Sequence, residues 1–181
     1  MIHRSGPRPG GRSARVQEAV HQAVRELEQE LGRSALTVPA IAQRAGVTPS
    51  TIYRRWGDLS QLLADVAVTQ MRPEAPPADT GAFKSDLVAW LQEYFEEISS
   101  GPGRAMLRDV LGTEGHERTG KCDGYVRQQL EEIRDRAMAR GEQVLETDQI
   151  VTVLMAPWMY RLLFANKPPT ADEIERGVES I

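Results

Sequence analysis

Apolar side chains recur at helical spacing along most of this chain, and this pattern constrains the fold more than any other feature. The pattern is clearest in residues 83–98, where one helical face would carry Phe83, Leu87, Trp90, Leu91, Tyr94, Phe95 and Ile98. No stretch shows the alternation of apolar and polar residues that is typical of a half-buried strand. Hydrophobic residues make up 40% of the 181 residues, which is enough for a sizeable core. The sequence therefore predicts an all-α fold.

Helix start and stop signals divide this pattern into about nine helices. Thr37 and Thr48 are candidate N-caps, and each is followed by a proline that the first turn of a helix tolerates. Gly46 can supply a left-handed turn between these two short helices. Asp58 and Gln61 fit a capping box for the next helix. The expected helices cover residues 16–31, 38–45, 49–56, 58–71, 83–98, 105–111, 122–139, 148–166 and 171–181.

The composition of the chain indicates where its domains begin and end. Residues 1–14 are rich in Gly, Pro, Arg and Ser without apolar periodicity, so we expect a flexible basic arm. A first domain is expected over 15–60, and its fourth helix, running to about residue 72, links it to the next domain. A proline-rich stretch then begins that no helix could cross. The second domain is therefore expected over 73–181.

The two ends of the chain differ in charge. Residues 1–60 hold nine Arg and no Lys against five acidic residues, whereas residues 61–181 hold 13 basic and 21 acidic residues. Because salt screens phosphate attraction beyond about 8 Å, a nucleic acid would bind at the N-terminal end. A charge imbalance of this size also occurs by ordinary scatter, so it favours nucleic-acid binding without establishing it.

Several classes of protein are not supported by the sequence. No apolar run reaches the roughly 20 residues of a membrane-spanning helix, and no signal peptide is recognisable, so we expect a cytoplasmic protein without membrane contact. The single Cys122 cannot form an internal disulfide, and the three His are scattered. No catalytic residues, cofactor or metal site are predicted. A small helical enzyme remains an alternative only if its catalytic residues lie far apart in the sequence and are brought together by the fold.

The two short helices around Gly46 fit a helix-turn-helix unit, in which the second helix enters the DNA major groove. Ala42 is small where two helices cross steeply, and Ile52 can fix the second helix to the core. This arrangement leaves a set of residues of the second helix facing outward, where they can reach bases and phosphates. The set is Pro49, Ser50, Thr51, Arg54 and Arg55.

The residues of this region resemble the TetR family of bacterial transcriptional regulators. The resemblance covers about residues 13–70 and centres on the stretch LTVPAIAQRAGVTPSTIYRRW, residues 36–56, followed by GDLSQLL, residues 57–63. A local likeness to a dimerisation helix lies in APWMYRLLF, residues 156–164. The resemblance implies a homodimeric repressor that binds a palindromic operator in double-stranded DNA and is released by a small-molecule inducer.

By position, the resemblance also implies roles for single residues. Thr37 and Tyr53 match residues that contact phosphates, although Tyr53 could equally be a packing residue. The start of the second helix, residues 48–51, matches the base-reading positions. Leu59 departs from the family, because many members have a Lys there that meets the DNA backbone. The full set of expected DNA-binding residues is Thr37, Arg44, Thr48, Pro49, Ser50, Thr51, Tyr53, Arg54 and Arg55.

Aromatic and Met side chains of the second domain could line a ligand pocket, because such side chains make adaptable apolar cavities. Each of them could instead serve only to pack the helices. Few charged residues lie on these faces, which favours a largely apolar inducer. The pocket candidates are Trp90, Tyr94, Met106, Leu107, Leu111, Met138, Leu154, Met155 and Trp158.

The last two expected helices offer apolar surface for a four-helix interface between two subunits, although a monomer could bury part of it. The interface candidates are Ile150, Val151, Leu154, Trp158, Arg161, Leu162, Ile174 and Val178. Besides the small helical enzyme considered above, the sequence leaves two alternatives to a ligand-released repressor. One is a helix-turn-helix activator, and the other is an adaptor without a ligand.

Overall fold

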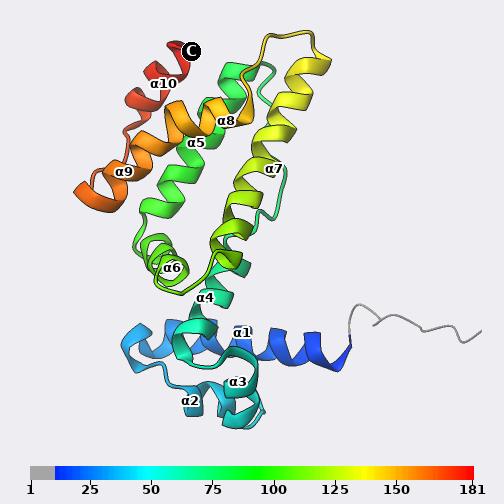
Figure 1. Ribbon diagram of the computed structural model, residues 1–181, viewed down its shortest axis with the longest axis vertical. Coiled ribbons are helices and arrows are strands. Elements are labelled where there is room, and N and C mark those ends of the chain that lie inside the picture. The colour runs from blue at the N-terminus through cyan, green and yellow to red at the C-terminus, as the bar shows by residue number, and fades with distance from the viewer. Residues whose placement is uncertain (1–10) are drawn as a thin grey trace, which may run out of the picture. The chain divides into compact units, whose positions relative to one another are not determined.

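The computed structural model describes residues 11–181, and across that range the chain is helical without any strand (Figure 1). The described residues form nine helices if the continuous segment 147–165 is counted once. They divide into two compact units, with the division between Ala67 and Val68. The prediction of an all-α fold with about nine helices is therefore confirmed. No helix in the described range is both long and apolar enough to cross a membrane.

The first unit packs three helices and the beginning of a fourth around a core of its own. Its elements are α1 (Arg12–Leu31), the short 3-10 turn η1 (Arg33–Ala35), α2 (Val38–Arg44), α3 (Pro49–Trp56) and the start of α4 (Leu59–Gln70). Ala42 and Ile52 are both completely buried in this core, as their expected packing roles require. The helix crossing that they allow holds α2 and α3 together.

The first helix begins earlier than its apolar pattern indicated. It starts at Arg12, and Gly11 occupies its N-cap position. Residues 12–14 of the expected flexible arm are therefore helical. Their side chains are exposed, so they carry no apolar signal that could have marked the helix start. The rest of the arm, residues 1–10, lies outside the described residues.

The second unit is a bundle around a larger aromatic and aliphatic core. Its elements are α5 (Phe83–Ser99), α6 (Gly101–Leu111), α7 (Glu117–Ala139), α8 (Thr147–Gln149), η2 (Ile150–Met155), α9 (Ala156–Ala165) and α10 (Ala171–Glu179). The segment η2 is a π-helical stretch that joins α8 to α9 without a break. Gly177 lets α10 pack closely on Trp158, because a Cβ at this position would lie 2.8 Å from the Trp158 ring.

Two helices of the bundle extend further toward the N-terminus than predicted. Helix α6 starts at Gly101, because the Ser100 hydroxyl accepts a hydrogen bond from the Gly103 N–H at 3.0 Å. A Cβ on Gly103 would lie 2.1 Å from the Glu97 carbonyl oxygen, so the glycine permits a close approach of α6 to α5. Helix α7 starts at Glu117, five residues before the predicted start. It continues through its glycines without interruption.

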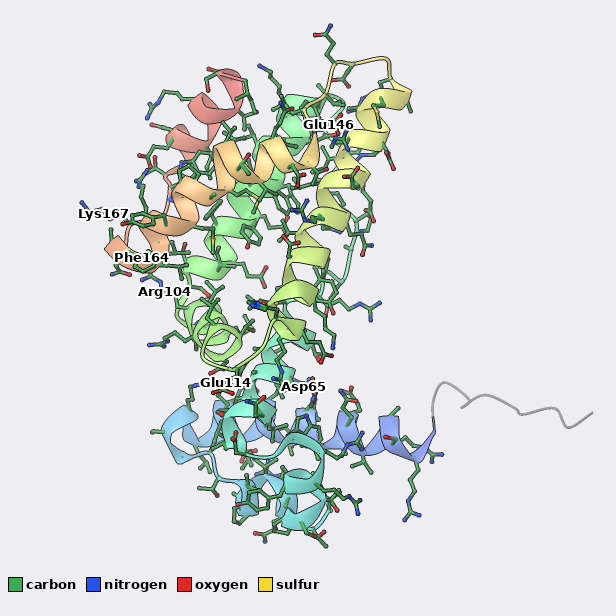
Figure 2. The ribbon with its side chains drawn as sticks, viewed as in Figure 1. Asp65, Arg104, Glu114, Glu146, Phe164 and Lys167 are labelled. Carbon is green, nitrogen blue, oxygen red and sulfur yellow. The ribbon has the colours of Figure 1, made fainter. Side chains whose placement is uncertain are left out.

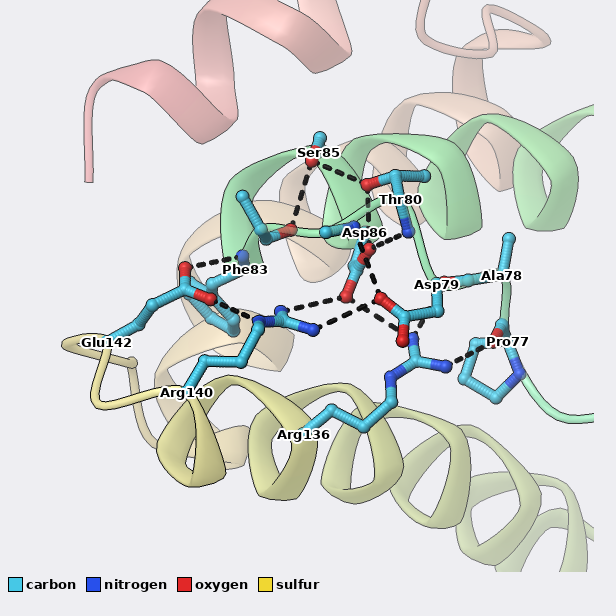
Figure 3. A network of polar contacts seen from close by, with 12 residues as sticks. Pro77, Ala78, Asp79, Thr80, Phe83, Ser85, Asp86, Arg136, Arg140 and Glu142 are labelled. Atoms are coloured by element: carbon cyan, nitrogen blue, oxygen red, sulfur yellow. Dashed lines mark hydrogen bonds and ion pairs between the residues drawn. The ribbon is translucent and has the colours of Figure 1, made fainter.

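A buried polar network fixes the chain segment that leads into α5 (Figure 3). The Asp86 carboxylate has no exposed surface and accepts hydrogen bonds from the Thr80 N–H and hydroxyl at 2.6 and 2.7 Å. It also pairs with Nη2 of Arg136 at 3.3 Å and Nη2 of Arg140 at 3.2 Å. Arg136 donates to the Pro77 carbonyl as well, at 2.7 Å. The network therefore ties the proline-rich segment to α5 and α7.

Candidate DNA-binding helices and ligand cavity

The turn between α2 and α3 has the backbone geometry that its sequence predicted. The Thr37 hydroxyl caps α2 by accepting a hydrogen bond from the Ala40 N–H at 3.3 Å. Gly46 has a φ of 66°, in the left-handed region that glycine adopts without steric cost. The Val47 N–H then donates to the Ala42 carbonyl at 2.9 Å. These contacts fix the direction in which α3 leaves the turn.

A carboxylate on α4 joins this helix to α1 and α3. Asp65, labelled in Figure 2, accepts a hydrogen bond from the Trp56 indole at 2.8 Å and lies 3.0 Å from Nε2 of the buried His21. Gln17 donates to the same carboxylate oxygen at 3.2 Å. The indole anchors the C-terminal end of α3, so Asp65 helps to hold the helix that would read DNA. Sequence reasoning missed this residue because it lies among apolar neighbours in a regular helix.

The predicted DNA-contacting residues at the start of α3 lie at the surface. Thr48, Pro49 and Ser50 are exposed, and Thr51 is half-buried. Thr48 occupies the N-cap position, as predicted. Its side chain makes no capping hydrogen bond to the helix, however, which differs from the prediction. Its hydroxyl instead lies 2.9 Å from the Ser50 hydroxyl and 3.0 Å from the Thr51 hydroxyl. Three hydroxyl groups are thereby gathered at the N-terminal end of α3.

The arginine candidates differ in how freely they could reach DNA. Arg54 is exposed and has no ion pair or hydrogen bond with another described side chain. Arg55 donates to the backbone carbonyl and hydroxyl of Ser13 at 2.9 and 2.8 Å. Arg44 pairs with Glu30 at 2.6 Å and with Glu26 at 3.2 Å, and these carboxylates raise its pKa further. Of the three guanidinium groups, that of Arg54 is therefore the most available to a phosphate or a base.

Tyr53 and Leu59 differ in how far their side chains are exposed. The Tyr53 side chain is 50% exposed on α3, so it is not a core residue. Thr37 is also exposed, next to the N-terminus of α2. Leu59 is half-buried and packs against the core of the first unit. The departure from the usual Lys therefore adds packing at the start of α4 in place of a cationic side chain.

A cavity of about 520 Å³ opens in the second unit. Its wall is formed by Gln70, Met71, Arg72, Pro73, Glu74, Ala75, Pro76, Pro77, Trp90, Glu93, Tyr94, Glu97, Ile98, Met106, Cys122, Tyr125, Val126 and Gln129. Three of the predicted pocket residues, Trp90, Tyr94 and Met106, belong to this wall. The volume falls within the range of about 300–1,000 Å³ that small-molecule sites occupy.

The other six pocket candidates do not line this cavity. Leu154, Met155 and Trp158 are buried in the bundle core, and Leu107 packs against that core. Leu111 and Met138 are 54% and 47% exposed. Helical spacing marks an inward face, but it does not tell which inward side chains fill the core and which border a cavity.

The cavity wall is also more polar than predicted. Arg72 and three glutamates belong to it, so the expectation of few charged residues is wrong. Seven of the 18 wall residues come from the segment that follows α4, which the sequence indicated only as a proline-rich connection. The Cys122 thiol donates to the Met71 sulfur at 3.7 Å across this wall, and burial raises the pKa of the thiol.

The two parts of the chain match two known families of sequence. Residues 21–66 match the bacterial regulatory proteins of the tetR family, and residues 77–181 match the tetracyclin repressor-like C-terminal domain. The chain belongs to the TetR family of transcriptional regulators. It is therefore a helix-turn-helix, DNA-binding regulator of a family that is not enzymatic.

Curated TetR-family relatives cover most of the chain. The HTH-type transcriptional regulator AqdR of Rhodococcus erythropolis is 32% identical over 154 residues, covering 83% of this chain and 74% of the relative. An uncharacterised HTH-type transcriptional regulator of Mycobacterium tuberculosis is 27% identical over 171 residues, covering 86% of this chain and 80% of the relative. The similarity therefore extends through both units.

Solved TetR-family structures share the fold. The regulator SCO0332 superposes with a TM-score of 0.66 at 23% identity, over 91% of this chain and 95% of that chain. A TetR regulator from Agrobacterium tumefaciens superposes with a TM-score of 0.58 at 16% identity, over 91% of both chains. These structures support the helical architecture of both units.

The residues predicted for a TetR-family dimer interface lie elsewhere than expected. Ile150, Leu154, Trp158, Leu162, Ile174 and Val178 are at most 8% exposed, because they fill the core of their own unit. Val151 is half-buried against that core. Arg161 is held by Glu173 through two hydrogen bonds of 3.0 and 3.2 Å. Six of the eight candidates are therefore buried within their own unit, and a direct role of these residues in an interface stays a prediction.

A different face of the same helical segment is exposed and apolar. Val153, Tyr160, Leu163 and Phe164 are 56%, 65%, 45% and 76% exposed. The rings of Tyr160 and Phe164 lie 4.9 Å apart between centroids. Large apolar side chains at this spacing form one stripe along η2 and α9, which we call the α9 stripe.

Proposed function

We propose that this TetR-family protein is a repressor that binds a palindromic operator as a homodimer and leaves it when a small molecule fills the cavity. The observation that carries the proposal is the surface of α3. This helix exposes Ser50, Tyr53 and Arg54, while Ile52 and Trp56 hold it to the core. A helix anchored on one face and polar on the other suits insertion into the major groove.

The residues of this surface are suited to different kinds of DNA contact. Arg54 can contact a guanine edge in a bidentate manner or neutralise a phosphate. The hydroxyls of Thr48, Ser50 and Thr51 form single hydrogen bonds, which discriminate bases less strongly. Tyr53 and Thr37 are exposed at positions suited to phosphate contacts, and phosphate contacts position the helix without reading sequence.

The α9 stripe supports the homodimer. One short recognition helix buries too little surface for specific operator binding, so two copies are needed. Contiguous apolar side chains at the surface are typical of protein interfaces. We infer that the stripes of two subunits pack against each other, with Tyr160 and Phe164 at the centre. A two-fold arrangement matches a palindromic site.

The cavity wall supports a role for a small molecule. Residues 71–77 form part of this wall and directly follow α4, whose Asp65 contacts the α3 indole. A ligand that favours one conformation of this segment can change the position of α4, because the segment is the direct continuation of that helix. Through α4 the change can reach the DNA-binding helices. Release of the operator then requires that the ligand bind the DNA-free conformation more tightly than the DNA-bound one.

Transcription in vitro tests the mode of regulation. A promoter carrying an operator obtained by sequence selection should lose transcript when the intact protein is added. The variant Arg54→Ala should restore most of the transcript, whereas Arg108→Ala, which removes an exposed arginine of α6, should repress like the wild type. An increase of transcript on adding protein would overturn the repressor assignment and favour an activator.

Light scattering tests the dimer separately. The wild type should have the mass of two chains, and the double variant Tyr160→Glu/Phe164→Glu should have the mass of one. Arg176→Glu places a carboxylate on the exposed face of α10 and should remain dimeric. A dimeric double variant would show that the α9 stripe is not the interface.

A further inference from the structure

The cavity presents two kinds of side chain from one face of α5. Trp90, Tyr94 and Ile98 recur at a spacing of four residues and supply an aromatic and apolar row. Glu93 and Glu97 have the same spacing and supply a row of carboxylates beside it. A ligand in this cavity therefore meets rings and negative charge together.

The carboxylates of the wall have no cationic partner. Glu74, Glu93 and Glu97 form no ion pair or hydrogen bond through their side chains with any other described residue. Glu93 and Glu97 are like charges one helical turn apart, an arrangement that destabilises a helix unless a cation lies nearby. The wall contributes only one cationic side chain, that of Arg72, against these three carboxylates.

The aromatic row contains a stacked pair of rings. The rings of Trp90 and Tyr94 are stacked, with centroids 5.3 Å apart and planes inclined by 17°. Tyr125 adds a third ring from α7. Burial and then the negative charges of Cys122, Glu97 and Asp123 raise the pKa of Tyr94 to about 12. The Tyr94 phenol therefore stays protonated at neutral pH.

We propose that the cavity binds a lipophilic cation, an aromatic or alkyl-substituted ammonium or ring-nitrogen cation of drug-like size. Its apolar part would contact Trp90, Tyr94 and Ile98, and its charge would lie near Glu93 and Glu97. Cations are attracted both to ring faces and to carboxylates. A neutral ligand would gain nothing from the carboxylates, and an anion would be repelled. The inference rests on the proposed ligand-binding role of this cavity, and it names the chemical class of that ligand.

Three probes of one shape but different charge test the inference directly. They are 10-methylacridinium, the neutral 9-methylanthracene and the anion anthracene-9-carboxylate, each titrated into the intact protein without DNA. Binding is followed by probe fluorescence and by quenching of tryptophan. The cation should bind at least about tenfold more tightly than the neutral probe, which corresponds to about 1.4 kcal/mol. Equal affinities, tighter binding of the neutral or anionic probe, or no binding of any probe would overturn the inference.

A variant pair assigns the effect to the carboxylates. Glu93→Gln/Glu97→Gln should weaken cation binding about tenfold and leave the neutral probe unchanged, because each exposed carboxylate contributes modestly. Glu96→Gln removes an exposed α5 carboxylate outside the wall and should bind like the wild type. If the double variant does not fold, the single variants Glu93→Gln and Glu97→Gln replace it. Each should show a smaller loss of affinity for the cation. Undiminished cation binding in the folded variants would place the cation elsewhere and refute the assignment.

The binding assay contains no DNA, so its outcome is independent of repression. Selective cation binding without any effect on an operator complex would support this inference and overturn ligand release. Operator release by a neutral compound, with no cation selectivity in the titrations, would support ligand release and overturn the inference of a cationic ligand.

Discussion

Replacing Asp86 by Asn tests the buried network that fixes the start of α5. The substitution keeps the shape of the side chain but removes the charge that faces Arg136 and Arg140. Removing one partner of a buried ion pair costs about 3–5 kcal/mol. Both arginine side chains keep about a quarter of their surface exposed, at 26% and 28%, so water can compensate them in part. We therefore expect a loss at the lower end, about 3 kcal/mol.

Thermal unfolding followed by circular dichroism measures this loss. A change of about 3 kcal/mol should lower Tm by about 10 °C in a domain of this size. Asp79→Asn is the matched control, because Asp79 also pairs with Arg140, at 3.1 Å, but is 56% exposed. An exposed pair is worth at most about 1 kcal/mol, so the control should lose only a few degrees. Equal Tm values for Asp86→Asn and the wild type would refute the argument.

The same network predicts a pH dependence. Burial opposes ionisation of Asp86, but hydrogen bonds from Thr80 and the charges of Arg140 and Arg136 outweigh it and hold its pKa below the ordinary value. An aspartate in the unfolded chain titrates near about 3.9. A lowered pKa in the folded state therefore stabilises the protein above about pH 4, and this stabilisation is lost as the pH falls toward the folded-state pKa. The Asp86→Asn variant should lose less of its Tm over this acidic range than the wild type.

Three further substitutions test single features. Gly103→Ala should lower stability by about 3 kcal/mol in chemical denaturation, because its Cβ would lie 2.1 Å from the Glu97 carbonyl oxygen. Gly46→Ala, where the site is sterically open, should cost only about 1–2 kcal/mol from its left-handed φ of 66°; a larger loss for Gly46→Ala than for Gly103→Ala would contradict this account. Arg54→Ala should reduce the slope of log affinity against log salt by about one if Arg54 contacts a phosphate, and an unchanged slope would exclude that contact.

Helix positions could be predicted well where apolar spacing and caps agree. Helices α2 and α3 begin and end within a residue or two of their predicted limits, because Thr37, Gly46 and Gly57 mark them. Prediction was less accurate at α6 and α7, where glycines near the first turns indicated a loop. Gly103 instead serves a close helix contact, and that role depends on tertiary structure that the local sequence does not contain.

The candidate sites show a second limit of sequence reasoning. Spacing placed Trp158 and Leu162 on an apolar helix face, but it could not tell whether that face packs on its own core or on a partner. Tyr160 and Phe164 lie in the stretch that resembles a dimerisation helix, but they were not among the interface candidates, because this helix is apolar on more than one face. The cavity carboxylates were missed because a glutamate at a cavity rim and one on an ordinary solvated face have the same local sequence pattern.

Sequence selection with the intact protein at physiological salt tests the central claim most directly. The protein should enrich a palindrome whose half-sites lie one helical turn or a multiple of it apart, as two copies of α3 require. Enrichment should be lost with Arg54→Ala and kept with Arg108→Ala. Binding without sequence preference that disappears as salt is added would reduce the first unit to a weakly basic surface and contradict the operator-binding role proposed for α3.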